Sequence, residues 1–236
     1  MLTPEEKQIC KDYFTVGYGV KKPDKPREFK KHGAAFWIIC TLTILPLVLI
    51  LLARGKVKAA WKAYDDEVEF RRVNYPAKFR DIIERYMAQD ALLAKALNKC
   101  GVDASEIEFF KPIYFRGQNF KRAAAYRGND ASLQTYSFVI CTEGQIMVYE
   151  LAHDFYADSS DKEKTTEYFY RDVTNFKNET VSIERKDGDQ TKEIESQAFV
   201  IVVPGDSYTL ELYGGDQNEI DEKIKGLKAL LRQKKM

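Results

Sequence analysis

Three cations stand close together in one polar stretch of the chain. They are Lys121, Arg122 and Arg127, and the last directly precedes a Gly128-Asn129-Asp130 turn. Guanidinium and ammonium groups bind phosphate oxygens, and a flexible basic loop beside an anionic membrane attracts lipid headgroups. The pattern therefore predicts a lipid-headgroup site at these three residues. A solvated basic loop near a membrane explains the same residues and stays open as the alternative.

A second polar stretch contains residues that could act as an acid or a base in catalysis. His153 stands beside Asp154, and Asp158, Asp161 and Glu163 follow. A carboxylate can orient a histidine as a general base, but no serine or cysteine nucleophile is marked by its sequence context. The acidic spacing does not match a calcium loop. We therefore assign no catalytic residue, metal ligand or cofactor, and keep a hydrolase built on His153 as a third hypothesis.

Composition excludes two further classes of protein. The 37 Lys+Arg residues balance 36 Asp+Glu residues, so the basic excess of a nucleic-acid-binding protein is missing. Cysteines 10, 40, 100 and 141 are far apart and form no CxxC motif, so neither a zinc ribbon nor a disulfide scaffold is expected. Unpaired thiols fit a reducing compartment, and we expect Cys141 to be a buried structural thiol.

One segment is suited to a membrane. Residues 34–53 contain no charged side chain, and a helix of this length spans roughly 30 Å, the thickness of a hydrocarbon core. Thirty-three residues precede the run and Arg54-Gly55-Lys56 follows it, which does not fit a cleaved signal peptide. The segment is therefore predicted to be a single transmembrane helix of a cell-membrane protein.

Basic residues flank this segment on both sides. Lys30 and Lys31 precede it, and Arg54, Lys56 and Lys58 follow. Orientation normally follows the difference in positive charge between the flanks, which is small here. Two cytosolic flanks would suit a shallow hairpin bent at Pro46, and this stays open beside the single pass. We expect anionic lipids near both flanks and place the C-terminal domain in the cytosol.

The elements around the membrane segment read as helices. Residues 1–33 combine a short helix, opened by a Thr3–Glu6 capping box, with a basic linker. Residues 54–102 are predicted to form a helical stalk or hairpin, divided in two at Tyr75-Pro76 because proline disfavours a helical residue before it. A heptad-like apolar seam at residues 57–75 suggests a homo-oligomer, and packing against another helix is the alternative.

The pattern changes to strands in residues 103–236. Apolar and polar residues alternate in several short runs, and Lys186-Asp187-Gly188-Asp189 is a strong hairpin signal. An amphipathic helix follows, with apolar residues from Ile220 to Leu231. The predicted fold is α+β: one N-terminal transmembrane helix, a helical stalk or hairpin, and a seven-stranded antiparallel barrel or sandwich capped by a C-terminal helix.

Two stretches of this C-terminal part resemble a known family. Residues 137–149, SFVICTEGQIMVY, and residues 167–173, EYFYRDV, are similar to a hairpin and a strand entry in the bacterial pleckstrin-homology-like (PH-like) domains of membrane-anchored proteins. The chain departs from the family at Gln145, where an arginine is common. The resemblance covers roughly residues 107–235 and implies a PH-like fold and a cytosolic adaptor or lipid-proximal module rather than an enzyme.

These observations lead to two main hypotheses of function. In the first, the protein is a membrane-anchored scaffold or adaptor that presents its PH-like domain to a protein partner. In the second, it is a peripheral sensor of anionic lipid headgroups, bound through Lys121, Arg122 and Arg127. The sequence names no partner protein, and the expected partners are membrane lipids and a protein, without nucleic acid.

Overall fold

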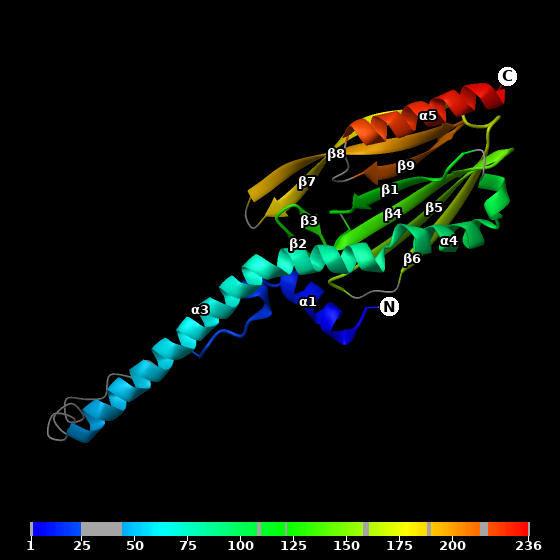
Figure 1. Ribbon diagram of the computed structural model, residues 1–236. Helices are drawn as coiled ribbons and strands as arrows, with labels where there is room; N and C mark the ends of the chain where they lie inside the picture. Colours follow the sequence, from blue (N-terminus) through cyan, green and yellow to red (C-terminus); the bar gives the residue numbers. More distant parts are fainter. Residues whose placement is uncertain are drawn as a thin grey trace.

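A computed structural model describes residues 2–24, 44–107, 110–120, 122–157, 161–187, 190–212 and 217–235. A long helix extends away from a compact body that contains the sheets and the shorter helices (Figure 1). The helices are α1 (Pro4–Phe14), α3 (Ile44–Tyr86), α4 (Gln89–Cys100) and α5 (Gln217–Lys235), with 3₁₀ turns η1 (Val16–Gly19) and η2 (Ala104–Ile107).

The strands form two antiparallel sheets and a small hairpin. The first sheet has the order β1-β4-β5-β6 and the second the order β7-β8-β9, while β2 pairs with β3. Their bounds are β1 (Ile113–Gln118), β2 (Tyr126–Arg127), β3 (Asp130–Ala131), β4 (Leu133–Cys141), β5 (Gln145–Asp154), β6 (Lys162–Phe169), β7 (Asn175–Asp187), β8 (Gln190–Val203) and β9 (Asp206–Leu212). The α+β class, the antiparallel sheets and the C-terminal helix are confirmed.

Strand details differ from the prediction in two places. Among the short alternating runs, the sequence predicts separate strands at residues 173–176 and 181–185. Instead, β7 runs unbroken from Asn175 through all of residues 181–185, paired along its length with β8. The pairing of Asp187 with Gln190 confirms the predicted hairpin at this point. The β2–β3 hairpin, which lies between β1 and β4, was not predicted because each of its strands has only two residues.

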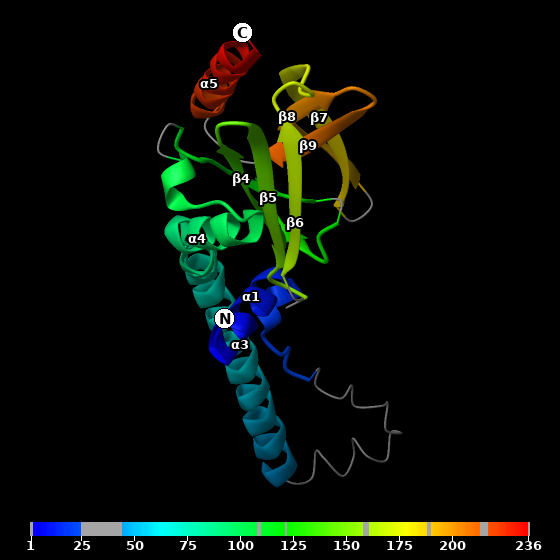
Figure 2. The ribbon, with the colours of Figure 1, turned by 90° about the vertical axis from the view of Figure 1, so that its right-hand side faces the viewer.

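The central strands of the first sheet, β4 and β5, are buried on both faces. Along β5, Ile146 and Val148 point into a core shared with the second sheet and α5, whereas Met147 and Tyr149 point into a core shared with α1, α3 and α4. Figure 2 shows α3 and α4 on one side of β4, β5 and β6, and β7 and β8 on the other. The core that contains α1, α3 and α4 therefore joins residues on both sides of residue 102, where the helical stalk was predicted to end and the β domain to begin.

Local signals set the start of α1, as predicted, and the end of α4. The Thr3 hydroxyl accepts a hydrogen bond from the Glu6 backbone N–H at 3.2 Å, and the Glu6 carboxylate accepts one from the Thr3 N–H at 2.7 Å. This capping box satisfies amides that lack partners inside the helix. Gly101 ends α4 in the left-handed region at φ 67°, a conformation that costs glycine little.

The predicted break at Tyr75-Pro76 is wrong, because α3 continues through it to Tyr86. Proline in a helix interior costs about 3 kcal/mol and removes one hydrogen bond to the carbonyl four residues earlier. That carbonyl belongs to Arg72, which is exposed to solvent. Burial of Phe79, Ile82 and Ile83 on the same helix contributes roughly 1.5–3 kcal/mol per side chain and outweighs this loss. The helix ends only before α4.

The heptad-like seam of α3 contacts residues 2–24 of the same chain, which we call the N-terminal segment. Tyr18 of η1 packs edge-on against Tyr75 with 6.3 Å between ring centroids. A Cβ on Gly17 would lie 3.0 Å from the Tyr64 hydroxyl. From Tyr64 to Tyr75 the seam is thus covered by residues that precede the apolar run, rather than by the next helix. Self-association through residues 57–75 stays a prediction.

The predicted membrane segment lies partly outside the described residues. These exclude positions 34–43, together with Lys30 and Lys31, and α3 begins at Ile44. Within the described part of the chain, no helix is both long enough and apolar enough to cross a membrane. Lys56 and Lys58 are exposed on α3. The single transmembrane helix has no support from the described residues and stays a prediction.

Candidate functional site

The predicted headgroup arginine Arg127 makes its contacts within the chain. It ends β2, and its guanidinium lies 4.0 Å from the centroid of the Tyr18 ring. It also donates a hydrogen bond of 2.5 Å to the backbone carbonyl oxygen of Thr15. A cation over an aromatic face is attracted by the ring quadrupole. Arg127 therefore fixes η1 against the β2–β3 hairpin.

Asp130, on the opposite strand of that hairpin, binds a residue of α1. Its carboxylate accepts a hydrogen bond of 2.6 Å from the Tyr13 hydroxyl. Burial, and then this carboxylate, raise the pKa of Tyr13. Arg122 is exposed, and Lys121 lies outside the described residues. The role of these three cations in binding lipid headgroups stays a prediction, with Arg127 engaged by the N-terminal segment.

A left-handed turn and an ion pair fasten the same segment to α3. Gly17, Tyr18 and Gly19 all have positive φ, at 65°, 54° and 71°, so the two glycines occupy positions that suit them. The Arg71 guanidinium donates to the Asp12 carboxylate at 2.7 Å and to the Tyr18 carbonyl at 3.0 Å. The N-terminal segment is thus bound to both the long helix and the hairpin.

His153 pairs with a different carboxylate from the one that the sequence suggested. The residue is 4% exposed, and Nδ1 lies 2.9 Å from Oδ1 of Asp161. Asp154 instead accepts backbone hydrogen bonds from Ala124, Tyr156 and Ala157 at 2.9–3.1 Å. Asp154 therefore orders two loops and does not orient His153. The proximity of Asp154 in sequence was misleading because adjacent residues on a strand point to opposite faces.

Asp161 belongs to a line of charges between α4 and β6. It also accepts from the Tyr86 hydroxyl at 3.1 Å, and Lys95 lies 3.4 Å away. Lys95 approaches Glu163 to 2.7 Å. Partial burial works to lower the pKa of Lys95, but the hydrogen bond to Glu163 and the nearby negative groups outweigh it and raise the pKa to about 12. The hydrogen bond from Lys95 likewise lowers the pKa of Glu163.

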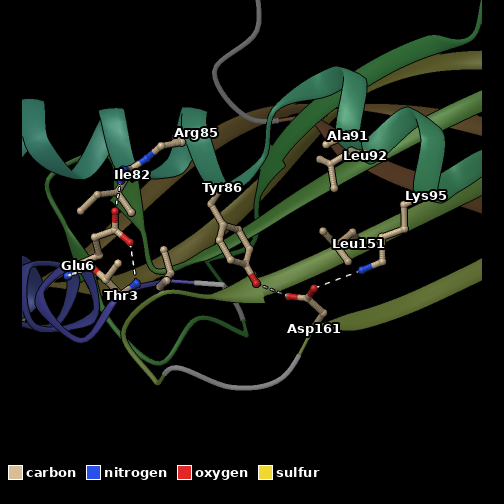
Figure 3. Close-up of a pocket in the computed structure, with 11 residues that line it drawn as sticks. Thr3, Glu6, Ile82, Arg85, Tyr86, Ala91, Leu92, Lys95, Leu151 and Asp161 are labelled. Carbon is tan, nitrogen blue, oxygen red and sulfur yellow. Dashed lines mark hydrogen bonds and ion pairs between the residues drawn. The ribbon is translucent and has the colours of Figure 1, made fainter.

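A pocket of about 500 Å³ opens beside these charges (Figure 3). Apolar side chains of α3, α4 and β5, together with Leu2, form much of its wall. Two opposite-charge pairs, Glu6 with Arg85 and Lys95 with Asp161, lie at its sides. Such a surface can take an apolar side chain of a partner and pair with polar groups next to it. The lining residues are Leu2, Thr3, Glu6, Ile82, Arg85, Tyr86, Ala91, Leu92, Lys95, Leu151 and Asp161.

Sequence reasoning missed this pocket because its walls come from distant parts of the chain. Leu2 and Glu6 were assigned to a separate N-terminal segment, and Leu151 to the β domain. One signal was available. Tyr13, Phe14 and Tyr18 are large apolar residues, and a short helix carrying them needs a surface on which to bury them. All three are buried.

The buried cysteines agree with the sequence interpretation. Cys10, Cys100 and Cys141 carry thiols rather than disulfides, and each is less than 9% exposed. Burial raises the pKa of Cys141 to about 12 and that of Cys100 to about 11. Cys141 is therefore confirmed as a buried structural thiol.

Comparison with protein-family models, with curated proteins and with solved structures finds no match to this chain.

Proposed function

We propose that this protein is a membrane-anchored, non-enzymatic adaptor that presents a PH-like β domain to a protein partner in the cytosol. The observation that carries the proposal is the continuity of α3. Its 43 residues begin within the apolar run and end in the core beneath the first sheet. At 1.5 Å per residue the helix is roughly 65 Å long. A rigid connection of this kind holds a domain at a fixed distance and orientation from its anchor.

The sheet topology supports the PH-like part of the proposal. Four antiparallel strands in the order β1-β4-β5-β6 are followed by three in the order β7-β8-β9 and then by α5. Ile224, Leu227 and Leu231 of α5 bury against the inner faces of the strands. A helix that covers the open end of two packed sheets completes such a core. The seven strands and the helix match the order that the resemblance in the sequence implies.

The pocket of Figure 3 is the proposed contact surface for the partner. Leu92 and Leu151 supply apolar wall, and Arg85 and Lys95 supply cations beside carboxylates. Interfaces commonly combine an apolar anchor site with a polar rim. We expect a partner segment that inserts one apolar side chain and places polar groups against the two ion pairs.

Two matched variants on α4 test this proposal. Ala91 lines the pocket and Ala94 does not, and both are exposed on the same helix. Ala91→Arg fills the pocket entrance, whereas Ala94→Arg adds the same side chain elsewhere. A photo-crosslinking residue placed at Gln89 in the membrane-bound full chain reports the partner. We expect Ala91→Arg to abolish the crosslinked product and Ala94→Arg to keep it. Equal crosslinking in both variants would refute the pocket as the contact surface.

A further inference from the structure

We infer that residues 2–24 and residues 55–235 lie on the same side of the membrane, so that the charge-free run 34–53 leaves the bilayer by the face through which it entered. This inference rests on the membrane anchor in the proposed function and goes beyond it. It replaces a single pass, which would put the two parts on opposite sides. The evidence is the contact between them, which lies entirely within the described residues.

The N-terminal segment forms part of the protein's core. Cys10, Tyr13 and Phe14 of α1 are 0%, 4% and 8% exposed. The Tyr13 ring stacks on Phe79 of α3 at 4.7 Å between centroids, and the Phe14 ring meets the same Phe79 edge-on at 5.1 Å. Phe79 is 1% exposed. Figures 1 and 2 both show α1 lying against α3 next to the sheets.

Polar contacts fix the same arrangement from three directions. Asp12 pairs with Arg71 of α3, Glu6 pairs with Arg85 near the end of that helix, and Tyr13 donates to Asp130 of the β2–β3 hairpin. Arg127 of the hairpin reaches back to Thr15. These pairs join residues 59 to 117 positions apart in the chain. A bilayer between the two parts would break every one of them and uncover the apolar face of α3.

The path of the chain also fits a return to the same face. Gly17 lies against Tyr64, ten residues beyond the end of the run at Ala53 and Arg54, or roughly 15 Å along α3. The fourteen residues 20–33 span up to about 45 Å when extended, so they can reach back to the membrane surface. The N-terminal segment therefore approaches the bilayer from the side on which α3 emerges.

The charges of both flanks agree with this placement. Lys21 and Lys22 before the run and Lys56 and Lys58 after it are all exposed. A segment that crosses once is oriented by an excess of Lys and Arg on its cytosolic flank. Two basic flanks on one side instead both face the anionic headgroups of one leaflet. Both flanks are basic because, in this arrangement, both lie on the same side of the membrane.

Paired cysteine variants of the full chain test the inference. Val16 is 86% exposed and precedes the run, and Lys225 is exposed on α5 and follows it. Each is replaced singly by Cys in a Cys40→Ser background, and intact cells are treated with a membrane-impermeant maleimide. We expect Val16→Cys and Lys225→Cys to behave identically, both unlabelled before permeabilisation and both labelled after it. If Val16→Cys fails to accumulate, the exposed Lys11 replaced by Cys gives the same readout.

Labelling of one position and protection of the other in intact cells would overturn the inference while leaving the membrane anchor in place. An alkaline carbonate wash of the same membranes separates this from failure of the anchor. Retention of both variants in the pellet supports the anchor. Release of both into the supernatant would overturn the anchor and, with it, the shared side.

Discussion

Gly19→Ala is expected to detach the N-terminal segment from α3. Gly19 has φ 71°, and a Cβ there would lie 2.3 Å from Oδ1 of Asp12. The left-handed conformation alone costs an alanine about 1–2 kcal/mol. The Asp12 carboxylate must also move, although it is held by Arg71 at 2.7 Å and by Gln8 at 2.7 Å. Loss of one charge-assisted hydrogen bond adds about 1.5–3 kcal/mol.

Gly205→Ala is the matched control for this change. Gly205 lies between β8 and β9 with φ 81°, and a Cβ there meets nothing within 4 Å. It therefore carries only the conformational cost. The two variants should differ by about 1.5–3 kcal/mol, which is the part due to displaced Asp12.

Hydrogen exchange of the α1 amides in the full chain in detergent micelles measures the effect. Segments held by fewer contacts open separately from the rest, and their opening free energy is read from the exchange rate. Both costs of Gly19→Ala act on the opening of α1, whereas Gly205→Ala acts on the distant β8–β9 turn, so Gly19→Ala should accelerate exchange in α1 by at least about 60-fold relative to Gly205→Ala. Equal exchange in the two variants would show that the turn at Gly19 does not hold α1. Combining Gly19→Ala with Asp12→Ala removes the clash, so the two losses should not add.

Three further measurements probe the rest of the structure. Phe79→Ala removes a fully buried ring and should lower the free energy of urea unfolding by about 3–5 kcal/mol. Phe70→Ala, at a position 53% exposed on the same helix, should change it by less than about 0.5 kcal/mol. Similar losses in the two variants would contradict the assigned packing of α3. The raised pKa of Cys141 means that a maleimide at pH 7 should label it only after denaturant is added, as read by peptide mass mapping. The hydrogen bond from Lys95 lowers the pKa of Glu163 below 4.5, so this pair stabilises the fold above pH 4.5, and its stabilisation is lost as pH falls through the folded-state pKa. Glu163→Gln should therefore lower the free energy of unfolding by about 0.2–1 kcal/mol at pH 6 and leave it unchanged near pH 2. A cost that does not depend on pH would argue against the ion pair.

Local features of the fold could be predicted from sequence because a few neighbouring residues decide them. The Thr3–Glu6 capping box begins α1 as expected, since both of its hydrogen bonds join residues three positions apart. The turn after Asp187 was found for the same reason. The strand content of residues 103–236 follows from alternation that side-chain geometry imposes on any half-buried strand.

Features decided by distant contacts could not be predicted in this way. Pro76 signals a helix end locally, but burial of Phe79 against Tyr13 and Phe14 overrides it. His153 stands next to Asp154 in sequence and pairs with Asp161 in space. Arg127 was grouped with its neighbours in a basic loop, whereas its partners are Tyr13 of α1, Thr15 and Tyr18 of η1. Each case needs the position of a segment that sequence spacing alone does not give.

The hydrogen bond between Tyr13 and Asp130 joins residues 117 positions apart, and this separation sets an order of events during synthesis. Ribosomes add roughly 5–20 residues per second, so α1 is made about 6–23 s before its acceptor in the hairpin. The apolar run begins at Ala34, after η1 and the basic linker, and is complete long before Asp130 is made. In the membrane-anchored protein that we propose, insertion of this run therefore acts on a chain whose first helix still has no partner. Phe79 of α3 is made before the hairpin and covers Tyr13 and Phe14, and Asp130 then binds the Tyr13 hydroxyl. Translation speed between residues 54 and 79 thus becomes a variable that controls how long Tyr13 and Phe14 stay uncovered.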